Sequence, residues 1–194
     1  MERHKEFAIP IERCPSCGAS GSSEFRGRIL KVPYFGEIME TLVSCSKCNL
    51  RHADVMCLGE HPPMRYEFLI SSDRDMSVRV VRSSTGTIKV PELGVTIEPG
   101  PASQGYVSNV EGVLNRIEEV LKLAIAQADE PRKKRGQALI EKLQAIRQGK
   151  LKARLILMDP FGHSAIVDER AKKRKLKRSE ILALKAGPLR LRRT

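Results

Sequence analysis

Apolar and polar positions follow two different periods along the chain. Between residues 62 and 101, short apolar runs are separated by turn residues, and the run at 78–82 mixes valines with arginines. Such runs are typical of half-buried strands. From 110 to 128 the apolar residues recur mostly at steps of three and four, which indicates an amphipathic helix. Alternation returns at 151–157, so the pattern predicts a β domain interrupted by helices.

The interrupting segment is expected to form two helices. Ser108 and Glu111 have the spacing of a capping box, so the first helix should begin there. Asp129 can cap a second helix, and Gly149 can end it. Because only a few residues join the two helices, they should form an antiparallel hairpin over about 108–148, inserted in the β domain.

The N-terminal part of the chain has a different organisation. It carries all five cysteines, and four of them form two Cys-x-x-Cys pairs. Extended stretches at 24–32 and 38–43 lie between the pairs, with turn residues from Pro33 to Gly36 joining them, and a third stretch at 51–56 follows. This order of knuckle, hairpin, knuckle and strand is typical of a zinc ribbon.

The paired cysteines are the candidate metal ligands. Zn²⁺ favours four ligands in a tetrahedron, and thiolates are among its preferred partners. Four thiolates leave no position for water, so one structural zinc ion is expected, held by four residues: Cys14, Cys17, Cys45 and Cys48. The alternatives are four unrelated buried thiols or a redox pair, but no βαβ pattern surrounds either pair. Gly18 and Asn49 follow the two knuckles, where a tight turn favours Gly or Asn. Cys57 is left over and is expected to pack as a small hydrophobic residue.

Charge is distributed unevenly. The net charge is +12, and residues 168–194 hold eleven Lys or Arg against three acidic residues. This segment is expected to be a solvated basic tail that can contact RNA without sequence preference. No apolar run reaches the ~20 residues needed to span a bilayer, and no signal peptide is evident, so a cytoplasmic protein without a membrane partner is expected.

The sequence resembles the ZPR-type zinc-finger family. The resemblance is carried by blocks in the family's order, which together cover about residues 10–167: Cys14–Gly18, Lys31–Ile38, Cys45–Asn49 with Arg51, Val90–Leu93, Ile97–Pro101, Gly105, Val110–Leu114 and Met158–Ser164. It implies a mainly β fold with α elements, in which a zinc ribbon is followed by a β-sandwich-like domain with an inserted helical hairpin. On this basis residues 1–60 form the ribbon, 61–167 the β domain and 168–194 the tail.

The resemblance also implies a function. Eukaryotic members of the family bind translation elongation factor one-alpha and assist its folding, so a protein-interaction factor with this partner is expected. The candidate contacts are Pro33, Tyr34 and Phe35 at the hairpin tip, with Arg51 and Glu111. Alternatively, the aromatic residues pack against the next module and Glu111 only caps a helix.

Two other functions compete with this one. A nucleic-acid-binding zinc-ribbon protein would use its basic tail on phosphates. An enzyme is not expected, because the four histidines show no pairing with a nucleophile at motif spacing and the sequence contains no P-loop, G-x-G-x-x-G or G-x-S-x-G motif.

Overall fold

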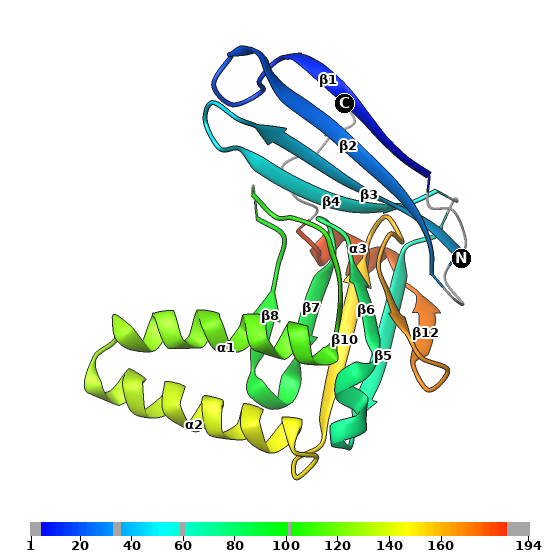
Figure 1. Cartoon of the computed structure of the whole chain (residues 1–194). Coiled ribbons are helices and arrows are strands. Elements are labelled where there is room, and N and C mark those ends of the chain that lie inside the picture. The colour runs from blue at the N-terminus through cyan, green and yellow to red at the C-terminus, as the bar shows by residue number, and fades with distance from the viewer. Residues whose placement is uncertain (1–4, 33–35, 59–60, 101, 186–194) are drawn as a thin grey trace.

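The protein consists of two modules. The computed structural model describes residues 5–32, 36–58, 61–100 and 102–185. A four-stranded N-terminal sheet lies above a β domain of two sheets, and a pair of long helices extends from the β domain to one side (Figure 1). The mainly β fold with an inserted helical hairpin is confirmed.

The N-terminal sheet is fully antiparallel, with strand order β1-β2-β3-β4. Its strands are β1 (Lys5–Arg13), β2 (Ser20–Val32), β3 (Gly36–Cys45) and β4 (Arg51–Cys57). The hairpin and the strand after the second knuckle are as predicted, whereas β1 was not predicted. Pro10 and the charged residues around it conceal the strand in the sequence, and a proline is tolerated there because β1 is an edge strand.

The β domain is built from two sheets. The larger has the order β12-β5-β10-β7-β8, and the smaller has the order β11-β6-β9. Their strands are β5 (Met64–Ile70), β6 (Arg79–Arg82), β7 (Thr87–Val90), β8 (Val95–Ile97), β9 (Tyr106–Asn109), β10 (Ala153–Asp159), β11 (Ala165–Val167) and β12 (Lys172–Lys175), with short 3₁₀ helices at Asp73–Ser77 and Pro91–Leu93.

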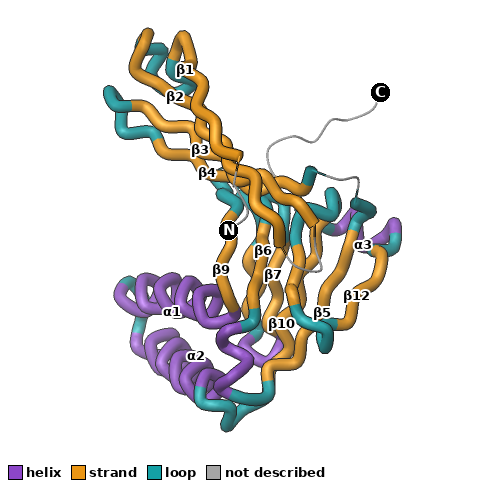
Figure 2. Tube along the Cα trace, turned by 45° about the vertical axis from the view of Figure 1, so that its right-hand side comes forward, coloured by secondary structure: helices purple, strands orange, loops and turns teal. Residues whose placement is uncertain are grey.

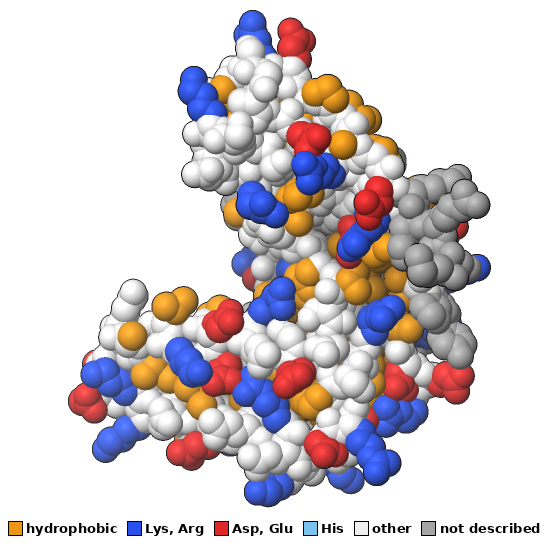
Figure 3. All heavy atoms as spheres, in the orientation of Figure 1, with side chains coloured by type: hydrophobic (Ala, Val, Ile, Leu, Met, Phe, Trp, Pro, Cys, Tyr) orange, Lys and Arg blue, Asp and Glu red, His pale blue; other side chains and the backbone are white. Residues whose placement is uncertain are grey.

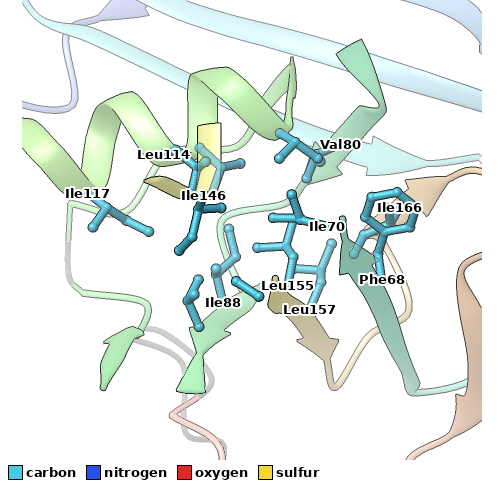
Figure 4. Close-up of a cluster of buried hydrophobic side chains, with 14 of the residues drawn as sticks. Phe68, Ile70, Val80, Ile88, Leu114, Ile117, Ile146, Leu155, Leu157 and Ile166 are labelled. Carbon is cyan, nitrogen blue, oxygen red and sulfur yellow. The ribbon is translucent and has the colours of Figure 1, made fainter. Parts of the chain in front are cut away.

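The core lies between the sheets and under the helices. Figure 4 shows side chains from the central strands β5 and β10 meeting side chains from both helices. Phe68, Leu155, Leu157 and Leu114 are fully buried there. Side chains at alternate positions of β5 and β10 enter this core, as the alternating pattern predicts.

The helical hairpin consists of α1 (Val110–Ala126) and α2 (Glu130–Arg147). Asp129 caps α2 as predicted, accepting a hydrogen bond from the amide of Arg132, but the cap of α1 is Asn109 rather than Ser108. Asn109 Oδ1 accepts the amide of Gly112 at 2.8 Å, because Ser108 still belongs to strand β9. None of the described helices is long and apolar enough to cross a membrane.

Part of the expected basic tail is built into the β domain, which corrects the sequence analysis. Residues 172–175 form edge strand β12 beside β5, and helix α3 (Arg178–Ala183) follows. Leu176 and Leu184 are buried against Ile156 and Met158 on the outer face of the larger sheet. These leucines anchor the segment while its lysines stay exposed. Figure 2 shows α3 and β12 together at one side of the sheet.

Candidate functional site

Two knuckles at the far end of the N-terminal sheet carry the four cysteines. The turn between β1 and β2 holds Cys14 and Cys17, and the Gly18 amide donates to the Cys14 carbonyl at 2.9 Å. Gly18 has a φ of +71°, and Asn49 has a φ of +56° at the equivalent place in the other knuckle. Both therefore adopt the left-handed conformation that Gly and Asn tolerate best, as the sequence analysis expected.

The thiols converge as metal ligands do. All four sulfur atoms lie within 4.8 Å of one another. The Sγ atoms of Cys14 and Cys48 are 3.7 Å apart, and those of Cys17 and Cys45 are 4.0 Å apart. A tetrahedral zinc ion with Zn–S bonds of about 2.3 Å requires S···S separations of about 3.8 Å. The four cysteines are thus positioned to bind one metal ion of this geometry.

Hydrogen bonds favour the thiolate form of two of the four cysteines, Cys45 and Cys14. Ser22 Oγ lies 3.4 Å from the Cys45 sulfur, and the hydrogen bond from this hydroxyl helps to hold the pKa of Cys45 at about 5. A backbone hydrogen bond from Cys17 lowers the pKa of Cys14 below its usual range. Donors to sulfur favour the thiolate, which is the form that binds zinc.

A groove lies where the N-terminal sheet meets strand β9. Its volume is about 790 Å³, and Figure 3 shows the surface hollowed between the N-terminal module and the helical hairpin. One wall is the sheet face with Leu42 and Val55, and the other includes Tyr106 and Val107. The groove is therefore lined by apolar and charged side chains together, and it contains residues from both modules.

Backbone contacts fix the base of the groove. The amide of Gly105 donates to the carbonyl of Ala53 at 3.2 Å, joining the β domain to β4. A Cβ atom on Gly105 would lie 2.5 Å from the amide nitrogen of Val55, so only glycine allows this approach. The Asp54 carboxylate accepts hydrogen bonds from the amide and hydroxyl of Ser84 at 3.0 and 2.7 Å. These contacts hold the two modules in a defined arrangement.

Arginines line the groove, and another covers the ring of Tyr106. Arg28 pairs with Glu40 across β2 and β3, whereas Arg51 makes no ion pair with any described residue. The Arg116 guanidinium lies over the ring of Tyr106, 4.2 Å from the centroid. The groove thus combines an aromatic ring with an uncommitted cation, Arg51.

The predicted contact residues have different outcomes. Arg51 lines the groove, while Glu111 is exposed in the first turn of α1 and is not part of the groove. Pro33, Tyr34 and Phe35 lie outside the described residues, as does the side chain of Cys57. The sequence analysis missed Tyr106 because its pattern indicates a strand at most and carries no information about which module faces it.

A buried carboxylate organises the turn after β10. Asp159 accepts hydrogen bonds from the hydroxyls of Ser83, Thr85 and Ser164 at 2.7, 2.9 and 2.6 Å. It also accepts the amide of Phe161, which remains 49% exposed. The segment Asp159–Gly162 is therefore a turn, and it is tightly held.

A cysteine-bearing antiparallel ribbon followed by a two-sheet β domain defines a class of zinc-finger proteins. Residues 9–63 match the ZPR1 zinc-finger domain, and residues 74–182 match the ZPR1 jelly-roll domain. The chain belongs to the ZPR1 family, as the resemblance in its sequence indicated.

The chain is also similar in sequence to ZPR1-family proteins of archaea and eukaryotes. A ZPR1-like protein of Methanocaldococcus jannaschii is 45% identical over 175 residues, covering 90% of this chain and 88% of that protein. A ZPR1-like protein of Pyrococcus horikoshii is 43% identical over 192 residues, covering 97% and 86%. The zinc finger chaperone zpr1 of Schizosaccharomyces pombe is 28% identical over 158 residues, which cover 78% of this chain and 34% of that longer protein.

Proposed function

We propose that this chain is a cytoplasmic zinc-binding protein-interaction factor, which binds translation elongation factor one-alpha of its own organism and assists its folding. The observation that carries the proposal is the groove between the modules, which a protein segment can enter. The choice of client rests on the family resemblance, and the chaperone role is supported by the name of the Schizosaccharomyces pombe relative.

One structural zinc ion belongs to the proposal. Four thiolates fill a tetrahedral coordination sphere, so the ion has no open position for a substrate. Its role is to close the two knuckles and thereby fix the strands that form one wall of the groove. For the same reason we propose no catalytic reaction at the metal.

The composition of the groove suits a protein client. Tyrosine and arginine are enriched in protein interfaces, where apolar contacts at the centre are surrounded by polar groups. Tyr106 and Val107 would contact apolar client side chains, and Arg51 would pair with an acidic one. An extended client segment would lie along the face of the sheet.

Calorimetry with the purified elongation factor tests this function. The zinc-loaded chain is titrated with the factor in GDP and then in GTP, and saturable binding is expected. Arg51→Glu should weaken binding at least tenfold, because it replaces the uncommitted cation of the groove with a negative charge that repels the acidic client side chain. Lys134→Glu is the matched control, since Lys134 is exposed on α2 and does not line the groove.

Two results would contradict the proposal. The first is no binding by the zinc-loaded chain with either nucleotide. The second is equal weakening by both substitutions, which would indicate a general charge effect rather than a contact in the groove.

A further inference from the structure

The C-terminal segment concentrates positive charge on an ordered part of the β domain. We call residues 172–185 the basic strap. It contains seven Lys or Arg and one acidic residue, Glu180. All four side chains of its strand β12 are exposed. The strap is therefore a dense array of cations on a folded surface.

The strap has a fixed position. Strand β12 pairs with β5 from Lys172 to Lys175, and the amide of Leu176 donates to the carbonyl of Pro63 at 2.9 Å. Leu176 and Leu184 are 8% exposed, and Lys185 at the end of the strap pairs with Glu98. Its cations are thus held in register, unlike those of a solvated tail.

Most of these cations form no ion pair within the part of the chain that the structure describes. Glu180 is occupied by Arg174, whose guanidinium donates to both carboxylate oxygens at 2.7 and 2.6 Å. The other cations of the strand and the turn after it form no ion pair with any residue the structure describes: Lys172, Lys173, Lys175, Lys177 and Arg178. Five unpaired positive charges on one short segment attract a polyanion, which can neutralise them together.

An exposed aromatic ring lies at the same end of the sheet. Met64 pairs with Lys175 on one side and with Asp159 on the other, so Lys175 and Asp159 are two strands apart, roughly 10 Å. Phe161 follows Asp159 in the tightly held turn, and its exposed ring stacks on His163 with the centroids 6.2 Å apart.

The linker between the modules contacts both the turn that carries Phe161 and the basic strap. A Cβ atom on Gly162 would lie 2.4 Å from the carbonyl oxygen of Pro62, and the next residue, Pro63, accepts the hydrogen bond from Leu176. The turn with Phe161 and the residue that follows β12 therefore both approach the same dipeptide, Pro62-Pro63. Because side chains alternate along a strand, Lys173 and Lys175 lie on the same face of the sheet as Asp159, close to the turn that carries Phe161.

We propose that the basic strap and Phe161 form a binding surface for single-stranded RNA. Lysines at fixed spacing neutralise successive phosphates, and the exposed phenyl ring stacks with one base, which is the combination used by sequence-tolerant single-strand binders. The stacking ring distinguishes this surface from a purely electrostatic one and favours a single strand, whose bases are free to stack, over a duplex.

Fluorescence anisotropy with a labelled oligouridine of about 15 nucleotides tests the proposal on the zinc-loaded full chain. Binding should weaken steeply with salt, with the logarithm of the affinity falling by about 0.7 per phosphate contact for each logarithmic unit of salt. Lys173→Ala with Lys175→Ala should weaken binding at least tenfold and reduce the salt slope by about 1.4, since two contacts are lost.

A substitution of the aromatic residue separates stacking from charge. Phe161→Ala should weaken binding about tenfold while leaving the salt slope unchanged, and Phe161→Tyr should restore binding because it retains an aromatic face. The matched control for the lysines is Lys134→Ala with Arg135→Ala on α2, which removes the same charge from exposed positions away from the strap and should change affinity less than twofold.

A shortened chain distinguishes the ordered surface from the terminus. The chain ending at Lys185 retains the strap and should keep oligouridine binding within about threefold. The proposal is overturned if this deletion abolishes binding while the Lys173 and Lys175 double substitution has no effect. It is also overturned if both double substitutions weaken binding equally, or if a duplex of the same length binds as tightly and Phe161→Ala has no effect.

Discussion

The zinc ribbon and the jelly-roll domain are stabilised in different ways. In the jelly-roll, both sheets and both long helices contribute to one continuous cluster of buried apolar side chains. In the ribbon, Val32, Ile38 and Val55 are buried only at the end that meets the jelly-roll, where they pack against Val81 and Ala165. The far end of the ribbon holds the four cysteines instead. A metal ion there takes the place of a hydrophobic core, because a small sheet cannot bury enough apolar surface alone.

The largest expected effect follows from removing the metal. Structural zinc contributes roughly 10–16 kcal/mol in small zinc modules, so a chelator should unfold the ribbon around the knuckles. The jelly-roll has its own core and should stay folded. Hydrogen–deuterium exchange measures this: amides of β2 and β3 should lose protection, whereas those of β5 and β10 should keep it. Simultaneous loss in both modules would show that they are not independent in stability.

A cavity in the core of the jelly-roll should destabilise that domain and leave the metal site of the ribbon intact. Leu155 is fully buried between the sheets, and Leu155→Ala should cost about 2–5 kcal/mol of the free energy of unfolding. Urea unfolding measures the loss, and the zinc content of the variant should be unchanged because the cysteines are remote from the core. Leu182→Ala is the control, since Leu182 is 75% exposed and should change stability by less than about 0.5 kcal/mol. Loss of zinc from the Leu155 variant would contradict the separation of the modules.

An ion pair between Asp75 and Arg170 in the jelly-roll should make the stability of the fold depend on pH. Burial opposes ionisation of Asp75, but hydrogen bonds from the amides of Ser71 and Ser72 and from Arg170 lower its pKa to about 2. Since the folded pKa lies below the ordinary value, the charged form stabilises the fold above about pH 4, and this contribution is lost as the pH falls towards 2. It amounts to about 2 kcal/mol at neutral pH.

Asp75→Asn should remove this acid-sensitive contribution. The free energies of unfolding of the wild type and the variant, measured in urea, should therefore differ by about 2 kcal/mol near pH 7 and converge only as the pH falls to about 2. Zinc content is measured in parallel, because protonated thiols release the metal and would add a separate acid transition from the ribbon. A difference that does not change with pH would mean that the ionised carboxylate is not the stabilising form.

The smallest effect compares the two knuckles. A Cβ atom on Gly18 meets no atom within 4 Å, so Gly18→Ala introduces only backbone strain at a φ of +71°. This strain costs about 1–2 kcal/mol, and competition with a chromophoric chelator should show zinc affinity reduced about tenfold. Asn49→Gly relieves a mildly strained residue in the other knuckle and should leave affinity unchanged or slightly higher. Equal losses in both variants would contradict this conformational explanation.

The features predicted from the sequence are those that local chemistry determines. The ligand set follows from the spacing of Cys14, Cys17, Cys45 and Cys48, and the strands and helices with strong periodicity were placed correctly. The role of Asp129 as a cap was also evident, because capping depends on neighbours a few residues away.

The features that escaped prediction depend on tertiary contacts. The run of lysines in β12 alone predicts a segment in solvent. Leu176 and Leu184, eight residues apart, anchor it to Ile156 and Met158, with Ile181 packed against them. The groove is similar, since Tyr106 and Arg51 are distant in sequence and are brought together by a backbone contact at Gly105. The hydrophobic pattern around Arg51 and the pattern around Tyr106 do not indicate that these two residues are close in space.

Hydrogen–deuterium exchange of the zinc-loaded chain, alone and saturated with the elongation factor, tests the central claim most directly. That claim is that the metal-held ribbon and the jelly-roll together form the client-binding groove. Added protection is predicted in β4 and β9, which line the groove, with no change in β12. Protection confined to β12 and α3, or no change in either groove strand at saturation, would contradict it.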